Sequence, residues 1–387
     1  MQLSALAGVH FLVDMLGNML PSILPEIRSQ FALSLSAGSF VLAALYLTAN
    51  GAQMLTGHLR PDRSKPLFLH LGLILAAAIC LLAPLPRSSG GVSAMLALAL
   101  VSGFGIAVAH PEGLRAIHLL TQIPPAISTA VFMTGGFLGF ASGGAISTIL
   151  VSQYGLAGLY PLVLCPVAGV LAITVLKVRL ATEPKVAEAQ AGGAVRNRPS
   201  FWLVVRMAVP AAVSTTIVVL LLPTRLNELG FELTFGGYSV TMFGLGGAVG
   251  SFVWGAIAHK KGELPCTIAA FFLTIPFLVL YLGWIKSSLA LWLLFGAGFC
   301  SVSAYILMIT LARYAKGPNL GWRMALIVGG TWALANLVFM ALVPVTGLFG
   351  THFTLSLAPL GYLLSGGLGL HIMLKTRRPT GQNVPSI

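Results

Sequence analysis

Asp14 occupies the position in this sequence that most strongly suggests chemistry, midway through the apolar run 3–27. A carboxylate at the centre of a bilayer costs about 3 kcal/mol or more unless it faces a wet cavity, is paired or is protonated. His10, Asp14 and Asn18 recur every four residues, which places them on one helix face over about 12 Å. We interpret this stripe as a cavity wall in which Asp14 and His10 exchange protons and Asn18 contacts a substrate. The alternative is a polar cluster that holds the helix to a neighbour.

A second ionisable group lies in the segment AHPEGLR, which ends at Arg115. Glu112 and Arg115 are three residues apart and can pair on one helix face, whereas His110 points roughly 200° away from Glu112. Pro111 lacks an N–H and favours a kink. The functional interpretation is a relay in which Glu112 and His110 carry protons and Arg115 is available to an anionic substrate. The alternative is a cytoplasmic helix end whose charges meet lipid headgroups.

Uncharged polar and aromatic residues in other apolar runs are candidates for substrate contact. Asn50 and Gln53 are three residues apart in one run, and Asn336 lies in a run near the C-terminus. Tyr305 and Trp332 could stack on a substrate. Hydrogen bonds between helices and ordinary packing explain all five residues equally well, so both interpretations stay open.

Two patterns suggest parts that move. Asp62 and Arg63 lie in the loop GHLRPDRSKP, where charge pairing and helix capping could lock a gate; a solvated loop is the alternative. Gly135, Gly139 and Gly143 recur every four residues on one helix face, and small residues let helix backbones approach closely. We expect these glycines to pack across the interface between two rocking halves.

The composition identifies the solvent in which these residues work. Of the 387 residues, 57% are hydrophobic and only 8% are charged, against about 25% charged in soluble domains, and the mean hydropathy is +0.93. The chain therefore cannot cover a water-facing surface, and the same values exclude disorder. Its four cysteines lie in or beside apolar runs without CxxC pairing, which indicates buried apolar residues and not a disulfide frame or metal site.

Apolar runs predict an all-α membrane protein with twelve transmembrane helices, because one crossing needs roughly 20 apolar residues. The predicted spans are approximately 3–27, 37–57, 67–84, 93–116, 126–151, 157–177, 201–223, 236–258, 264–284, 288–312, 322–344 and 350–374. With the N-terminus in the cytoplasm, the outer loops hold only four of the 22 Lys and Arg residues. This asymmetry predicts that both termini are cytoplasmic, and it explains the net charge of +13 without nucleic-acid binding.

A long polar stretch divides six predicted spans from six. Pro25 and Pro223 are 198 residues apart, and Arg115 and Arg313 share that offset, which indicates a duplicated six-helix unit. Duplicated units are typical of secondary transporters with a binding site near the membrane midplane. We predict an N-terminal bundle over 1–177, a cytoplasmic linker over 178–200 and a C-terminal bundle over 201–387.

These features together resemble a major facilitator superfamily transporter over essentially the whole chain. Within that superfamily, three segments are similar to the fosmidomycin-resistance-type efflux proteins: His10-x3-Asp14, Ala109–Arg115 and Val131–Gly139. The resemblance implies a proton-driven exporter of a small drug-like or anionic molecule. The glycines from Gly135 onward resemble the antiporter motif of the superfamily, although Phe140 occupies its usual proline position.

We therefore predict a proton-coupled antiporter in a bacterial plasma membrane that exports a small organic solute by alternating access. The alternatives are an importer or facilitator of a sugar or organic anion, and a non-transporting receptor or membrane enzyme. The sequence has no HExxH, Walker or GxSxG motif, so we expect no enzyme activity, cofactor or metal. The expected partners are the substrate, protons and the bilayer, and we expect a monomer.

Overall fold

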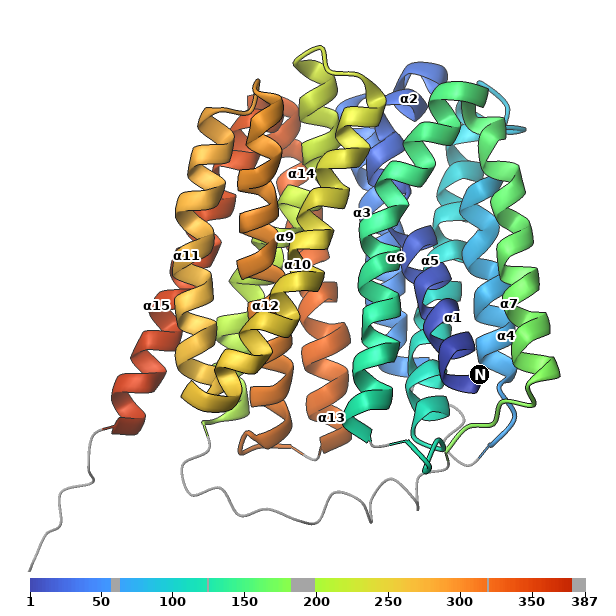
Figure 1. Cartoon of the computed structure of the whole chain (residues 1–387). Helices are drawn as coiled ribbons and strands as arrows, with labels where there is room; N and C mark the ends of the chain where they lie inside the picture. The colour runs from blue at the N-terminus through green and yellow to red at the C-terminus, as the bar shows by residue number, and fades with distance from the viewer. Residues whose placement is uncertain (57–62, 124, 182–198, 319, 378–387) are drawn as a thin grey trace, which may run out of the picture.

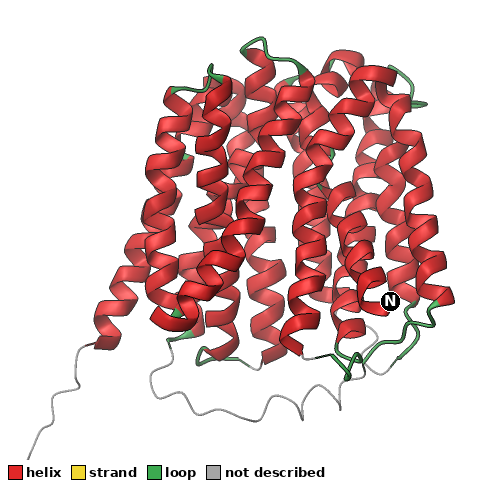
Figure 2. Cartoon of the chain, in the orientation of Figure 1, coloured by secondary structure: helices red, strands yellow, loops and turns green. Residues whose placement is uncertain are grey.

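The computed structural model describes residues 1–56, 63–123, 125–181, 199–318 and 320–377. These residues form helices and loops without named strands (Figure 2). The first half contains α1 (Gln2–Gly17), α2 (Leu20–Phe31), α3 (Leu35–Thr56), α4 (Leu67–Ala76), η1 (Ala77–Leu81), α5 (Ser89–Ile117), α6 (Pro125–Tyr154), η2 (Gly155–Val163) and α7 (Leu164–Val175). The second half contains α9 (Phe201–Glu228), α10 (Leu233–Lys261), α11 (Glu263–Gly283), η3 (Ser288–Ala290), α12 (Leu291–Tyr314), α13 (Leu320–Ala325), η4 (Leu326–Gly330), α14 (Thr331–Ser356) and α15 (Ala358–Arg377).

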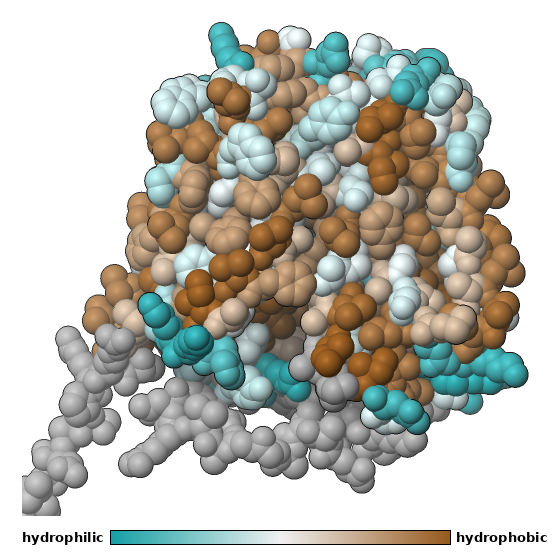
Figure 3. Space-filling view, viewed as in Figure 1, coloured by the Kyte–Doolittle hydropathy of each residue, from teal (hydrophilic) through white to brown (hydrophobic). Residues whose placement is uncertain are grey.

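The helices cross a bilayer repeatedly. Nine segments of the described chain are long and apolar enough to span it, and two apolar helices, Leu67–Leu81 and Ala358–Leu374, are shorter. The segment Ile127–Val175 has 49 residues, more than twice the roughly 20 that one crossing needs, and its helices α6 and α7 run in opposite directions (Figure 1). The nine segments and the two shorter helices coincide with the predicted spans, and Ile127–Val175 covers two of them. An apolar belt separates two more hydrophilic ends (Figure 3).

The first span is broken near its middle, and this break positions a polar residue. Helix α1 ends at Gly17 and α2 begins at Leu20, with Pro21 in its first turn. Proline has no N–H to continue the α1 hydrogen-bond ladder, so it favours a new helix start at this point. Asn18 lies at the break, where its side-chain amide donates to the carbonyl of Phe140 on α6 at 2.6 Å.

The two halves lie side by side (Figure 1). They meet where α6 contacts α10, where α3 contacts α14, and where α2 contacts α9. The N-terminus and the described end of α15 lie at the same end of the molecule, the lower end in Figure 1. This arrangement agrees with the prediction that both termini lie on one side of the membrane.

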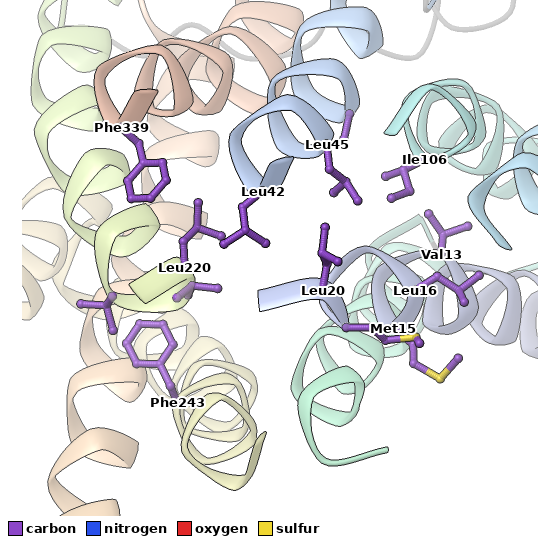
Figure 4. Close-up of a cluster of buried hydrophobic side chains, with 14 of the residues drawn as sticks. Val13, Met15, Leu16, Leu20, Leu42, Leu45, Ile106, Leu220, Phe243 and Phe339 are labelled. Atoms are coloured by element: carbon purple, nitrogen blue, oxygen red, sulfur yellow. The ribbon is translucent and has the colours of Figure 1, made fainter. Parts of the chain in front are cut away.

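Apolar side chains from both halves close the region above the middle of the molecule. Leu20 of α2, Leu42 of α3, Leu220 of α9, Phe243 of α10 and Phe339 of α14 are each at most 1% exposed, and they converge in Figure 4. Dense packing of this kind leaves no room for water. We call these five residues the apolar plug.

The glycine stripe of α6 packs within the first half, which corrects the expectation that it lies between the halves. A Cβ at Gly135, Gly139 or Gly143 would overlap backbone carbonyls of α1, so the three glycines allow α6 and α1 to touch at backbone distance. Gly144 on α6 and Gly237 on α10 are among the glycines that do meet the opposite half. A Cβ at Gly144 would lie 2.8 Å from the carbonyl oxygen of Gly237.

Candidate functional site

A cavity of about 290 Å³ lies between the two halves. Its lining in the described residues includes nine of the residues that the sequence singled out: His10, Asp14, Asn18, Asn50, Gln53, His110, Tyr305, Trp332 and Asn336. The lining includes residues 45–53 of α3 and 133–140 of α6. In both helices these residues lie toward the lower end of the molecule in Figure 1, where the N-terminus is placed. The cavity therefore extends toward the end that holds the N-terminus and the described end of α15, and the apolar plug closes its opposite end.

Asp14 lies between two histidines from different helices. Its Oδ1 is 2.9 Å from Nε2 of His110 on α5, and its Oδ2 is 3.3 Å from Nε2 of His10 on α1. The histidine rings meet edge-on, with centroids 5.2 Å apart. His10 is 6% exposed, while His110 and Asp14 are 19% and 24% exposed, so the carboxylate faces the cavity from a mostly buried cluster. We call His10, Asp14 and His110 the triad.

Backbone carbonyls set the orientation of both imidazoles. Nδ1–H of His10 donates to the carbonyl of Phe132 at 2.9 Å, and Nδ1–H of His110 donates to the carbonyl of Ile106 at 2.9 Å. A carbonyl oxygen only accepts, so each Nδ1 must carry a proton. A neutral imidazole would then turn the lone pair of Nε2 toward Asp14. A hydrogen bond between Nε2 and the carboxylate therefore requires one further proton, held either by the imidazole or by Asp14.

Helix α6 supplies the remaining wall of the triad through residues that sequence reasoning missed. The ring of Phe132 stacks on His10 with centroids 4.2 Å apart and planes 19° apart. A Cβ at Gly136 would lie 2.6 Å from Oδ2 of Asp14 and 2.6 Å from Nε2 of His10, so only glycine leaves the cluster its space. Gly136 directly follows Gly135 in the sequence, but the spacing argument selected only every fourth residue.

The triad is also the group in the described residues that could hold a metal ion by geometry. Its possible ligand atoms lie within 4.8 Å of one another, and two imidazoles with a carboxylate are a known ligand set for transition metals. We expected no metal site from the sequence, in which His110 and Asp14 are 96 residues apart. The direct contact at 2.9 Å between His110 and Asp14 is, however, the geometry of a shared proton.

Glu112 and Arg115 lie outside the cavity lining. Oε2 of Glu112 accepts from the backbone N–H of Leu69 at 2.8 Å, in the first turn of α4, where N–H groups lack partners within the helix. Arg115 lies 3.9 Å from Glu112, and it donates to the carbonyls of Ala181 at 2.9 Å and Arg63 at 2.6 Å. The pair therefore connects α5 to the start of α4 and to the backbone at Arg63 and Ala181. Neither residue of the pair belongs to the cavity lining.

The gate residues predicted in the loop after α3 are only partly visible. Asp62 lies outside the described residues, so its predicted pairing stays a prediction. Arg63 is described, and its carbonyl accepts the hydrogen bond from Arg115. This contact ties the loop to the end of α5.

Comparisons with known proteins agree with this architecture. Residues 6–319 match the family described as the Major Facilitator Superfamily. The chain belongs to the major facilitator superfamily. This major facilitator protein is therefore a multi-pass membrane protein and a secondary transporter of a small molecule, not an enzyme.

Two relatives are similar in sequence. The fosmidomycin resistance protein of Escherichia coli (strain K12) is 28% identical over 174 residues, which cover 45% of this chain and 41% of that protein. The chain thus matches about two fifths of that relative's length. An uncharacterized MFS-type transporter of Bacillus subtilis (strain 168), YfnC, is 20% identical over 365 residues, which cover 90% of this chain and 88% of that protein.

Two solved structures share the fold of this major facilitator transporter. One is a bacterial homolog of the human lysosomal transporter Spinster in an inward-facing and occupied conformation, with a TM-score of 0.67, 15% identity, and coverage of 98% of both chains. The other is a POT family transporter in complex with a thioalcohol-conjugated peptide, with a TM-score of 0.71, 12% identity, and coverage of 97% of this chain and 96% of that chain. At these identities the likeness concerns the fold alone.

Proposed function

We propose that this transporter is a proton-coupled antiporter that exports a small organic solute from the cytoplasm of a bacterium. The observation that carries the proposal is the position of the triad at the wall of the central cavity, with Asp14 between two imidazoles. Ionisable groups inside a membrane protein are costly and mark proton or substrate pathways. Similarity to the fosmidomycin resistance protein supports the direction of transport.

The fixed tautomers of the two histidines give the triad its proton chemistry. When one proton is present in addition to the two on the Nδ1 atoms, Asp14 forms a hydrogen bond with one imidazole. The Nε2 lone pair of the other imidazole then faces a carboxylate oxygen with no hydrogen between them. When two additional protons are present, both contacts are hydrogen bonds and the triad carries a net positive charge. The two states differ by one proton and one charge, so a change of access from one side of the membrane to the other can move a proton.

The titratable groups that face Asp14 come from three helices. His10 lies on the same helix and His110 on α5, while Tyr46 on α3 donates its hydroxyl to Asn18 at 3.2 Å. Helix α6 faces Asp14 with Gly136 and Phe132, which do not titrate. Proton exchange at the cavity is therefore assigned to the triad, with Asp14 as its centre.

The coupled movement in this proposal is a rocking of residues 1–177 against residues 201–387. Residues at both ends of the intervening segment pair with their own halves. Leu180 N–H donates to the carbonyl of Ser64 at 2.9 Å, and Lys316 N–H donates to the carbonyl of Pro199 at 2.9 Å. The close contact of Gly144 with Gly237 provides a smooth surface near which the halves can pivot.

Exchange in proteoliposomes under an imposed pH gradient tests the proposal. Asp14→Asn removes the central proton acceptor and should abolish gradient-driven exchange. Glu112→Gln is the matched control, because Glu112 is buried but lies outside the cavity, and each correctly folded molecule should keep coupled transport. The proposal fails if Asp14→Asn retains gradient-driven exchange.

A further inference from the structure

The described lining of the central cavity holds one carboxylate and no permanent cation. Among the described lining residues Asp14 is the carboxylate, and neither lysine nor arginine is present. Arg115, which the sequence suggested for an anionic substrate, bonds backbone carbonyls outside the cavity. An anionic substrate that enters would find no permanent cation to replace its lost hydration.

Two carboxamides of the lining, those of Asn50 and Asn336, bind the helix backbone through their nitrogens. The amide nitrogens of Asn50 and Asn336 donate to the carbonyls of Tyr46 and Trp332, one helical turn earlier, both at 2.8 Å. A nitrogen must face each carbonyl, which fixes the assignment of the amide atoms and turns the oxygens away from the helix backbone. Oδ1 of Asn336 is buried and has no hydrogen-bond partner among the described residues. A buried acceptor of this kind costs about 1–3 kcal/mol unless a donor reaches it.

Two hydroxyl donors of the lining are occupied as well. Tyr305 donates to the carbonyl of Ile327, and Ser301 donates to the carbonyl of Ala297 at 2.8 Å. Each Nδ1–H of the two histidines is bound to a carbonyl as well. With these donors bound to backbone carbonyls, acceptor oxygens such as those of Asp14 remain in the lining, which suits a substrate that brings donors of its own.

Aromatic rings complete the lining on the side of the second half. Tyr305 and Trp332 meet with centroids 4.9 Å apart and planes 64° apart. The faces of such rings attract cations and cover apolar surface. A cavity of about 290 Å³ is at the small end of the range for organic ligands.

We infer that the substrate is a small amphipathic organic cation, a protonated amine with an apolar body. Its N–H groups bind acceptor oxygens, including those of Asp14 and Asn336, and its body lies against Tyr305 and Trp332. This inference deepens the proposed function and rests on it, because Asp14 must lose protons to attract an ammonium group. The ammonium and the protons then compete for the same carboxylate, which makes their exchange obligatory.

A matched series of three probes tests the charge of the substrate. The purified full chain in lipid nanodiscs is heated with 4-phenylbutylamine, 4-phenylbutan-1-ol or 4-phenylbutyrate, and the shift of the unfolding midpoint with concentration gives each Kd. The amine should bind roughly ten- to hundredfold more tightly than the alcohol, as expected for one charge-assisted hydrogen bond, and the carboxylate should bind more weakly than the alcohol. Equal or tighter binding of 4-phenylbutyrate would overturn the inference.

Two variants locate the site. Asn336→Leu removes the buried acceptor and should weaken amine binding about tenfold with little effect on the alcohol, whereas Asn227→Leu, at the exposed end of α9, should leave both unchanged. If Asn336→Leu does not fold, Asp14→Asn serves instead and should remove the preference for amine over alcohol. An unchanged preference in the variant that folds contradicts the assignment.

Failure of the inference and failure of the proposed function give different results. Preferred binding of 4-phenylbutyrate together with gradient-driven exchange that depends on Asp14 rejects the organic cation alone. Preferred binding of the amine without any pH-driven exchange rejects proton coupling alone.

Discussion

At the scale of single residues, the proton exchange that we propose for Asp14 depends on how its neighbours are oriented. Two backbone carbonyls orient the imidazoles, and Phe132 stacks on one of them. Preorganised partners of this kind change the energy of a charge without having to move first. Substitutions that disturb the arrangement of the triad should therefore affect coupling more than they affect folding.

Gly136→Ala tests the space that the triad needs. The added methyl group would lie 2.6 Å from Oδ2 of Asp14 and Nε2 of His10, so it must push these groups apart. We expect the rate of pH-driven exchange to fall at least about tenfold. A tenfold loss corresponds to about 1.4 kcal/mol of free energy that the displaced groups no longer contribute. Gly8→Ala on α1 is the control, because its Cβ would meet nothing within 4 Å. Equal exchange rates in the two variants would show that the space beside the triad is unimportant.

Glu112 is expected to act on stability. Its carboxylate binds the N–H of Leu69 at the start of α4 and is 3% exposed. Glu112→Gln weakens a charge-assisted hydrogen bond, which should lower the free energy of unfolding by about 1–2 kcal/mol. Thermal unfolding in detergent measures this change against Glu232→Gln, an exposed glutamate before α10. Equal midpoints for the two variants would exclude the capping role.

At the scale of the elements, sequence periodicity predicts which residues share one face of a helix. It does not predict which residues of different helices contact each other. The spacing of His10, Asp14 and Asn18 places them on one face, and the structure puts all three in the cavity lining. The depth of Glu112 could not be predicted, because it depends on where α5 ends relative to α4. The partner of the glycine stripe could not be predicted either, since close packing requires small residues wherever the neighbour lies.

The two sets of glycines on α6 should therefore behave differently when they are replaced. Gly139→Ala forces α6 away from α1 inside the first half, and we expect it to destabilise the protein by about 2 kcal/mol. Gly237→Ala acts where the halves meet, beside Gly144 and Thr148, and should reduce the exchange rate more than the unfolding midpoint. The exchange rate and the unfolding midpoint are measured for both variants. If the loss of exchange rate relative to the loss of midpoint is the same in both variants, the two sets of glycines do not differ in this way.

At the scale of the whole molecule, composition and length predict the apolar spans and their division into two halves. Apolar runs need only be counted, and the 198-residue offset indicates the duplication. Composition does not predict which end of the cavity is closed, because that depends on how the two halves pack against each other. Here the apolar plug closes one end, while the lining extends toward the terminal end.

The orientation of the molecule in the membrane is set by its basic residues. Because outer loops hold four of the 22 Lys and Arg residues under the predicted topology, both termini should be cytoplasmic. Single-cysteine tags at each terminus should react with a membrane-impermeant maleimide only after the cells are opened. Labelling of either tag in intact spheroplasts would contradict the predicted topology. The cavity would then extend toward the outside of the cell and not toward the cytoplasm.

The central claim is that Asp14 and the two histidines take up and release protons as one unit. Infrared difference spectra of the purified protein in lipid, recorded between about pH 5 and pH 8, where histidines titrate, measure this directly and need no substrate. We expect the spectrum of the unmodified protein to contain a carboxyl component and an imidazole component that change together, that are missing from the spectrum of Asp14→Asn and that are retained in Glu112→Gln. Identical spectra for Asp14→Asn and the unmodified protein over this range would contradict the claim.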